Sequence, residues 1–305
     1  VTRLGSSGSV LYCVWGASAN SVWAGGGVDS GDVVHYINGQ FQYYKTGMYG
    51  VYSINGTSDS DIWFGGGGAM SHWNGNSFAL YVFNGDSLPN MQQSFGAIWI
   101  APDNEIFAVG GGGAIVHRKP DYTWEVMQSG TTLDLTSMRG FSSNNIYAVG
   151  NDPNCSGCTG IILHYNGNAW QTVAMGKLPP PTDTTILVGD FKGIGGAMED
   201  SLYVVGERIY IHHSSRWTLA NAPCNERNQP SCGAYVEGVA GTSWNNVWIV
   251  GDFGWMMHFD GDHWEKDYQF FNLSSSLVFN NVLAFPNDVF SVGWDNNTAY
   301  FIHGQ

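Results

Sequence analysis

Short runs in which apolar and polar residues alternate follow one another along the whole chain, and most are bounded by Gly, Asn, Asp or Ser. Alternation over about four to eight residues predicts a half-buried β-strand. Asn-Gly or Asp-Gly between two such runs predicts a tight hairpin. Both signals occur together in HYNGNAW, which ends at Trp170, and in HFDGDHW, which ends at Trp264. The pattern therefore predicts many short antiparallel strands.

One unit of this pattern recurs seven times. It begins with a short polar residue, a β-branched residue or Leu, and an aromatic residue, and it continues through small residues to a Gly. The aromatic residues are Trp23, Trp63, Phe107, Tyr147, Tyr203, Trp248 and Phe290. A later strand of each unit carries a His, namely His35, His72, His117, His164, His212, His258 and His303. A repeat of about 40 to 50 residues with four strands is typical of a β-propeller blade.

Each unit divides into four strands, named a to d in chain order, of which b carries the aromatic residue and c the His. We therefore predict an all-β fold, a seven-bladed β-propeller of four-stranded blades that forms a single domain over residues 1–305. The predicted blades are 9–47, 48–89, 90–132, 133–184, 185–233, 234–276, and 277–305 with 1–8. The last unit has no strand d after His303, so the N-terminal strand is expected to complete blade seven and close the ring.

The repeat resembles those of bacterial secreted β-propellers with WD-like or Asp-box-like repeats, and the resemblance covers the whole chain. It implies the architecture but not an activity. Neither a WD dipeptide nor a strict S-x-D-x-G-x-x-W box recurs. No narrower family follows from the sequence.

Composition agrees with this fold and narrows the range of partners. Charged residues make up 12% of the chain and 42 of its 305 residues are Gly, which disfavours a helical protein. The net charge of −14 disfavours nucleic acids and anionic membranes as partners. Apolar runs are far shorter than the roughly 18 residues that membrane insertion needs. The start at Val1 without a basic and apolar leader suits a processed secreted protein or a fragment.

The repeated His and Gly residues have structural interpretations. Seven His in seven blades lie too far apart to share a metal ion, so we interpret them as core residues that form hydrogen bonds between blades. We interpret the Gly runs as turns between strands b and c, where Gly allows a positive φ. No cofactor is expected. Calcium stays open, although the short acidic loops 29–32 and 59–61 lack the ligand count of a recognisable site.

Strand a is expected to line the central channel. Two residues before its aligned hydrophobic position lie Tyr12, Tyr52, Gly96, Thr136, Lys192, Glu237 and Asn280. Lys192 and Glu237 hold this position in neighbouring blades, which predicts an ion pair. The axial polar candidates are Arg139, Asp134, Asp190, Lys192 and Glu237. Clustered carboxylates could do acid–base chemistry or bind a cation, and a solvated rim is the alternative.

Three long insertions fall in loops of the face that carries the b–c turns and the d–a connections. They are the Pro-rich stretch 177–185 and the loops that hold two Cys pairs. We predict disulfides Cys155–Cys158 and Cys224–Cys232, which imply an oxidising compartment. The alternative is one zinc ion held by all four thiolates.

The same face carries aromatic and polar residues that the repeat does not require. They are Trp255, Trp294, Phe253, Asp252, Asp295 and Asn296. Aromatic rings beside carboxylate and amide groups suit a sugar. The alternative is that both Trp residues only cover the blade ends.

These features favour a non-catalytic extracellular protein that binds a glycan or a surface protein through this face. The alternatives are a self-associating structural subunit of an extracellular assembly and a hydrolase that uses the axial carboxylates. No Ser-His-Asp order, HExxH motif or nucleotide-binding loop in a suitable context supports catalysis.

Overall fold

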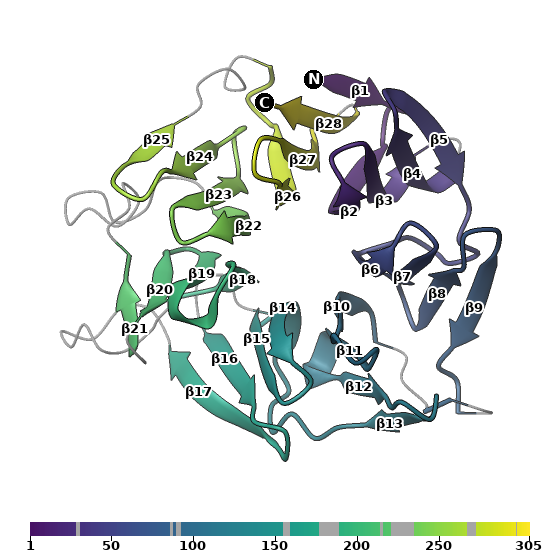
Figure 1. Cartoon of the computed structure of the whole chain (residues 1–305), viewed down its shortest axis with the longest axis vertical. Coiled ribbons are helices and arrows are strands. Elements are labelled where there is room, and N and C mark those ends of the chain that lie inside the picture. The colour runs from purple at the N-terminus through teal and green to yellow at the C-terminus, as the bar shows by residue number, and fades with distance from the viewer. Residues whose placement is uncertain are drawn as a thin grey trace.

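The alternating segments form strands, and the strands form seven separate antiparallel sheets. The computed structural model describes residues 1–28, 31–85, 88–89, 93–154, 159–176, 189–213, 216–220, 235–266, 273–296 and 298–305. Each of the seven sheets has four strands, and the sheets form a ring around a central axis (Figure 1). This confirms the predicted all-β, seven-bladed propeller.

Blades one to four use consecutive strands in chain order. Blade one holds β2 (Val10–Ser18), β3 (Ser21–Val28), β4 (Gly31–Ile37) and β5 (Gln40–Tyr44). Blade two holds β6 (Ser53–Ser58), β7 (Asp61–Gly65), β8 (Ala69–Trp73) and β9 (Phe78–Val82). Blade three holds β10 (Phe95–Ile100), β11 (Ile106–Gly110), β12 (Ile115–Arg118) and β13 (Trp124–Val126). Blade four holds β14 (Asp134–Ser142), β15 (Asn145–Asn151), β16 (Gly160–Tyr165) and β17 (Trp170–Gly176).

Blades five and six repeat this order, and blade seven joins the two ends of the chain. Blade five holds β18 (Phe191–Gly195), β19 (Leu202–Gly206), β20 (Tyr210–His213) and β21 (Arg216–Leu219). Blade six holds β22 (Val236–Ser243), β23 (Asn246–Gly251), β24 (Met256–Phe259) and β25 (Trp264–Lys266). Blade seven holds β26 (Val278–Ala284), β27 (Val289–Trp294), β28 (Ala299–Gly304) and β1 (Thr2–Leu4). Strand β1 pairs with β28 as expected for ring closure.

The repeated His stacks on the repeated aromatic residue of its own blade. In six blades the two ring planes are within 23° of parallel, and the centroid distances run from 3.9 Å for Trp23 and His35 to 4.5 Å for Trp63 and His72. Blade five departs from this arrangement, because His212 pairs with Leu202 instead of with Tyr203. The stack anchors strand b to strand c in each of the six regular blades.

The hydrogen bonds of these His residues correct the predicted role. The imidazole bonds a polar residue at the start of strand b in the same blade, as in His72 Nε2 to Asp61 Oδ1 at 2.7 Å and His258 Nε2 to Asn246 Oδ1 at 2.9 Å. In blades one and four the network extends to a neighbour. Ser21 Oγ, bonded to His35, donates to Asp59 of blade two, and Asn145, which bonds His164, donates through Nδ2 to Glu199 of blade five. The His itself therefore bonds within its own blade, so the predicted direct hydrogen bond between blades was wrong, and in blades one and four the link to the neighbour runs through Ser21 or Asn145.

Gly68, Gly112 and Gly113 have the positive φ predicted for the turns between strands b and c. The Gly that recurs at the end of strand b is required for a different reason. Opposite it, strand a carries a β-bulge. The register shifts there in six blades, as between Leu11 and Cys13 or between Leu135 and Ser137. A Cβ on Gly26 would lie 2.1 Å from Val10 O. The equivalent Gly66, Gly110, Gly150, Gly206, Gly251 and Gly293 would meet a carbonyl oxygen at 1.8 to 2.4 Å. Close approach at the bulge, and not a positive φ, requires this Gly.

Candidate functional site

The innermost strands of all seven blades enclose an axial channel of about 540 Å³. The bulge places one residue of each regular strand a toward this channel, because a bulge redirects a side chain. Together with Tyr52 of blade two, these residues form a ring on the channel wall, called the bulge ring below. Its members are Tyr12, Tyr52, Gly96, Thr136, Lys192, Glu237 and Asn280.

Several bulge-ring side chains connect neighbouring blades. Asn280 Nδ2 donates to Leu11 O at 2.6 Å, which ties blade seven to blade one. Thr136 Oγ1 lies 3.2 Å from Phe191 O and 3.1 Å from Lys192 O, which ties blade four to blade five. The rings of Tyr12 and Tyr52 have centroids 5.5 Å apart. This part of the bulge ring therefore stabilises the closed ring of blades.

Lys192 and Glu237 share the bulge ring, but they do not form the predicted direct ion pair. Neither side chain makes an ion pair within the part of the chain that the structure describes. Lys192 Nζ instead lies 5.8 Å from the ring centre of Tyr235. Burial raises the pKa of Glu237, while the charge of Lys192 lowers it and the charges of Asp252 and Asp190 raise it further. The aligned positions meet on one wall, but the prediction of contact was wrong.

Of the other axial candidates, only Arg139 lines the channel. Its guanidinium carbon lies 5.8 Å from the ring centre of Phe141. Burial lowers the pKa of Arg139. Asp134 accepts a hydrogen bond from Gly112 N at 2.7 Å and does not line the channel, and buried Asp190 does not line it either. Glu237 is therefore the single acidic candidate on the channel wall.

The predicted sugar platform in blade six is partly covered. Phe253 is exposed and has a positive φ of 57°, so its ring projects from the turn. Trp255 is half-buried against the core cluster shared by blades five and six. Lys266 Nζ lies 4.0 Å from the ring centre of Trp255, which covers one aromatic face. Phe253 is thus the freely exposed aromatic ring of this pair.

The carboxylates of that face are engaged in turns. Asp252 Oδ2 accepts a hydrogen bond from Tyr235 N at 3.2 Å. Asp295 is buried and accepts hydrogen bonds from Thr298 N and Tyr300 Oη, each at 3.0 Å. Trp294 is half-buried at the end of β27, and Asn296 beside it is exposed. The predicted residues are near one another within each turn, but their carboxylates already accept hydrogen bonds from backbone amides and, in Asp295, from the Tyr300 hydroxyl.

The predicted disulfide residues Cys155, Cys158, Cys224 and Cys232 lie outside the described residues, as does the Pro-rich stretch 177–185. The remaining Cys13 is a free thiol, and burial raises its pKa. Among the described residues, no group of three or more His, Cys, Asp or Glu side chains is arranged to hold a metal ion. No helix within the same residues is long and apolar enough to cross a membrane.

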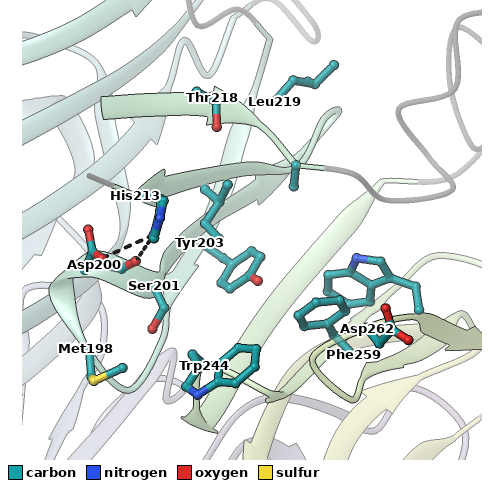
Figure 2. Close-up of a pocket in the computed structure, with 13 residues that line it drawn as sticks. Met198, Asp200, Ser201, Tyr203, His213, Thr218, Leu219, Trp244, Phe259 and Asp262 are labelled. Carbon is teal, nitrogen blue, oxygen red and sulfur yellow. Dashed lines mark hydrogen bonds and ion pairs between the residues drawn. The ribbon is translucent and has the colours of Figure 1, made fainter. Parts of the chain in front are cut away.

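A groove of about 740 Å³ lies between blades five and six (Figure 2). Its apolar lining comes from the β19 to β21 side of blade five and from the turns and outer strands of blade six. The apolar and aromatic lining residues are Met198, Tyr203, Ile211, Leu219, Ala220, Trp244, Phe259 and Trp264. Met198 and Trp244 belong to turns between strands a and b, so the groove opens toward the face opposite the predicted one.

Three large apolar side chains of this groove remain in contact with solvent. Trp244 is 55% exposed, Met198 48% and Leu219 39%. Asp200 and Asp262 lie at the groove, and both carboxylates are largely exposed. His213 Nδ1 lies 3.2 Å from Asp200 Oδ2 (Figure 2). The groove therefore combines an apolar floor with acidic edges.

Tyr203 lies at the floor of the groove, and Figure 2 shows its ring facing the same space as Trp244 and Phe259. Burial raises the pKa of Tyr203 to about 12, so its hydroxyl is protonated at neutral pH. That hydroxyl donates to no residue in the described part of the chain. The register shift of blade five, which moves His212 opposite Leu202, leaves the Tyr203 ring without the stacked His of the other blades.

This groove was not predicted from the sequence, although the sequence contains one signal for it. Four residues before the strand-b aromatic, the other copies carry small, acidic or Pro residues, whereas blade six carries Trp244. Blade five carries Met198 at the preceding position, where four other copies have Ser. Departures from the repeat at two facing turns would have indicated the groove.

Comparisons with known proteins agree on the fold. The chain matches no family model and no curated protein sequence. It is similar to the structure of YCF48 bound to D1 peptide, with a TM-score of 0.69 and 15% identity over 98% of this chain and 93% of that one. The structure of YCF48 from Cyanidioschyzon merolae is similar to it with a TM-score of 0.66 and 14% sequence identity, over 98% of both chains. The WD40 propeller domain of Doa1 has a TM-score of 0.58 and 11% sequence identity, over 100% of this chain and 96% of that one.

Proposed function

We propose that this protein is a non-catalytic binding protein that holds an apolar segment of another protein in the groove between blades five and six. The observation that carries the proposal is the exposure of Trp244, Met198 and Leu219 around one groove. Exposed apolar side chains that gather in a concave site are typical of binding surfaces. Trp is also the residue type that most often dominates binding energy at an interface.

The edges of the groove indicate the charge of the partner. Asp200 and Asp262 place two exposed carboxylates beside the apolar floor. The chain as a whole carries a net charge of −14, which attracts basic partners and repels acidic ones. The Tyr203 hydroxyl can donate to a backbone carbonyl of a bound segment. We therefore expect an apolar side chain flanked by Lys or Arg.

Two further considerations support a binding role. A propeller of similar fold, YCF48, has been solved bound to a peptide, so this architecture can hold a polypeptide segment. The absence of a catalytic motif in the sequence favours a protein without enzymatic activity. A hydrolase that uses axial carboxylates is less well supported, because Glu237 alone of the predicted acids lines the channel.

A glycan is the second candidate ligand. The observation in its favour is that aromatic rings and carboxylates line the same groove, since a ring can stack on a sugar and a carboxylate can accept its hydroxyl protons. The exposed ring of Phe253 is weaker support for a glycan site on the opposite face. We propose an extracellular setting for either ligand. The low fraction of charged residues, 12%, and the two closely spaced pairs of Cys in the sequence support it. A self-associating subunit remains the structural alternative.

The test is selection of random peptides on the wild-type protein, followed by affinity measurements with variants. We expect enrichment of peptides that combine an apolar residue with Lys or Arg, and a loss of affinity of about tenfold or more in Trp244→Ala. The matched control is Tyr49→Ala, which removes a 96% exposed aromatic ring outside the groove and should leave affinity unchanged. Equal affinity of Trp244→Ala and wild type would refute the proposal. Binding of the wild-type protein to a glycan on an array, if Trp244→Ala abolishes it, would favour the second candidate.

A further inference from the structure

The axial channel holds two basic side chains without an acidic contact, in a chain that is rich in acids. The sequence has 25 Asp and Glu against 11 Lys and Arg. Lys192 and Arg139 nevertheless line one cavity, and neither forms an ion pair in the described part of the chain. A buried or half-buried cation without a partner is costly, so its retention points to an anionic ligand.

Lys192 reaches the channel from the bulge of β18. Its Nζ forms no hydrogen bond among the described residues, and its nearest described aromatic contact is the Tyr235 ring at 5.8 Å. Among the described residues that line the channel, Glu237 on the adjacent β22 is the single acid. Because burial raises the pKa of Glu237, this carboxyl gives up its proton less readily than an exposed one and opposes a bound anion less strongly.

Arg139 lies deeper along the channel wall. It follows the bulge residue Thr136 by three positions on β14, so its Cα lies about 10 Å further along that strand at the rise of a β-strand. Its Nε is buried without a hydrogen-bond partner. The two basic residues are thus anchored at two levels of the channel wall, on neighbouring blades.

On the opposite wall the lining residues that the structure describes are uncharged, and two of them are open to solvent. Figure 1 shows β2 and β6 across the ring from β18 and β22. Strand β2 presents Tyr12, and Tyr52 immediately precedes β6; both rings are exposed. Their two hydroxyls can donate to an anion that enters from this side. A cavity of about 540 Å³ has room for a small organic ligand.

From this arrangement we infer that the axial channel binds a dicarboxylate, with one carboxylate on Lys192 and the other on Arg139. Two anionic groups match two cations at separate levels, whereas a monocarboxylate satisfies one of them. The guanidinium can hold a carboxylate through two parallel hydrogen bonds, and the ammonium acts as a point charge. The ligand is a free dicarboxylic acid or a peptide end whose last residue is Asp or Glu, since both present two neighbouring carboxylates.

The experiment is calorimetric titration of the whole chain with malonate, succinate, glutarate and adipate, with acetate as the one-charge probe. A short peptide ending in Asp, with a free or an amidated carboxyl terminus, distinguishes the two sources. We expect at least one dicarboxylate to bind about tenfold or more tightly than acetate, and the binding to weaken with added salt. Lys192→Gln and Arg139→Gln should each lower that affinity about tenfold or more.

Matched controls separate this result from a general effect of charge. Lys119→Gln removes a surface Lys that pairs with Glu125, and Arg216→Gln removes an exposed Arg on β21. Neither should change dicarboxylate affinity. If Arg139→Gln does not fold, Arg139→Lys takes its place. It keeps the charge but loses the bidentate contact, so it should bind the dicarboxylate more weakly than wild type. Equal dicarboxylate and acetate affinities in wild type, or no binding of either, overturn the inference.

Discussion

His35 stacks on Trp23 with ring centroids 3.9 Å apart and ring planes 12° apart, and its Nε2 lies 2.8 Å from Ser21 Oγ. Ser21 Oγ is in turn 2.5 Å from Asp59 Oδ1 of blade two. Burial lowers the pKa of His35 to about 4, although the charge of Asp59 raises it in part. The imidazole is therefore neutral in the folded protein at neutral pH.

This histidine should make the protein sensitive to mild acid. In the unfolded chain His35 takes up a proton near pH 6.5, whereas in the folded protein it does so near pH 4. The unfolded state binds more protons between these values, so the free energy of unfolding should fall as the pH falls through this window. The loss due to His35 is at most about 3 kcal/mol.

Urea unfolding of wild type and His35→Gln at several pH values measures this effect. The variant should show a shallower loss of stability between about pH 6.5 and 4. The remaining slope includes His164 and His258, whose pKa values burial also lowers, and Glu237, whose raised pKa acts in the opposite direction. Identical slopes for the two proteins would contradict the prediction.

Adjacent glycines in β3 provide a test of the bulge. A Cβ on Gly26 would lie 2.1 Å from Val10 O, whereas a Cβ on the exposed Gly27 would have no neighbour within 4 Å. Gly26→Ala should lower the free energy of unfolding by about 2 kcal/mol or more, because the strand-a backbone must shift. Gly27→Ala should change it by less than about 0.5 kcal/mol. Thermal melts of both variants would disprove the bulge explanation if the two losses were equal.

The bulge also shows what the sequence could and could not predict. The repeated aromatic, His and Gly positions specified seven blades, because alternation and hairpin turns are local properties. The reason for Gly26 could not be read from the pattern, since a bulge adds one residue to strand a and the close contact arises only when a and b pair. The role of His35 was misassigned for a similar reason, because its partner Ser21 becomes a neighbour only through strand pairing.

The candidate sites were likewise predictable from the sequence only in part. The channel position of Lys192 and Glu237 was predictable, because it follows from the alignment of the repeats. Their separation was not, since it depends on the direction of flexible side chains. The groove beside Trp244 was missed because it forms between two blades, from residues about 40 positions apart in sequence or in different turns. A sequence repeat thus predicts the structure within a blade better than the contacts between blades.

Ring closure through β1 should depend on Leu4. This strand has three residues, and Leu4 is buried in the core cluster shared by blades one and seven. Thr298 Oγ1 also donates to Leu4 O at 3.0 Å. Leu4→Ala should lower the free energy of unfolding by about 2 to 3 kcal/mol. Val1→Ala, at an exposed position before β1, is the control and should have little effect in the same denaturant series. A Leu4→Ala protein as stable as Val1→Ala would show that closure does not depend on this contact.

Glu237 should destabilise the fold at neutral pH. Burial raises its pKa, so over the pH range above its ordinary value of 4.5 the folded state binds more protons than the unfolded state, and stability declines as the pH rises through that range. Glu237→Gln removes the buried charge and keeps the size of the side chain. The variant should therefore melt at a higher temperature than wild type at pH 7, and the difference should shrink toward pH 4. Asp262→Asn, which neutralises a largely exposed acid of blade six, should leave the melting temperature almost unchanged. A lower melting temperature for Glu237→Gln at pH 7 would mean that attraction to Lys192 outweighs the cost of burying the carboxylate.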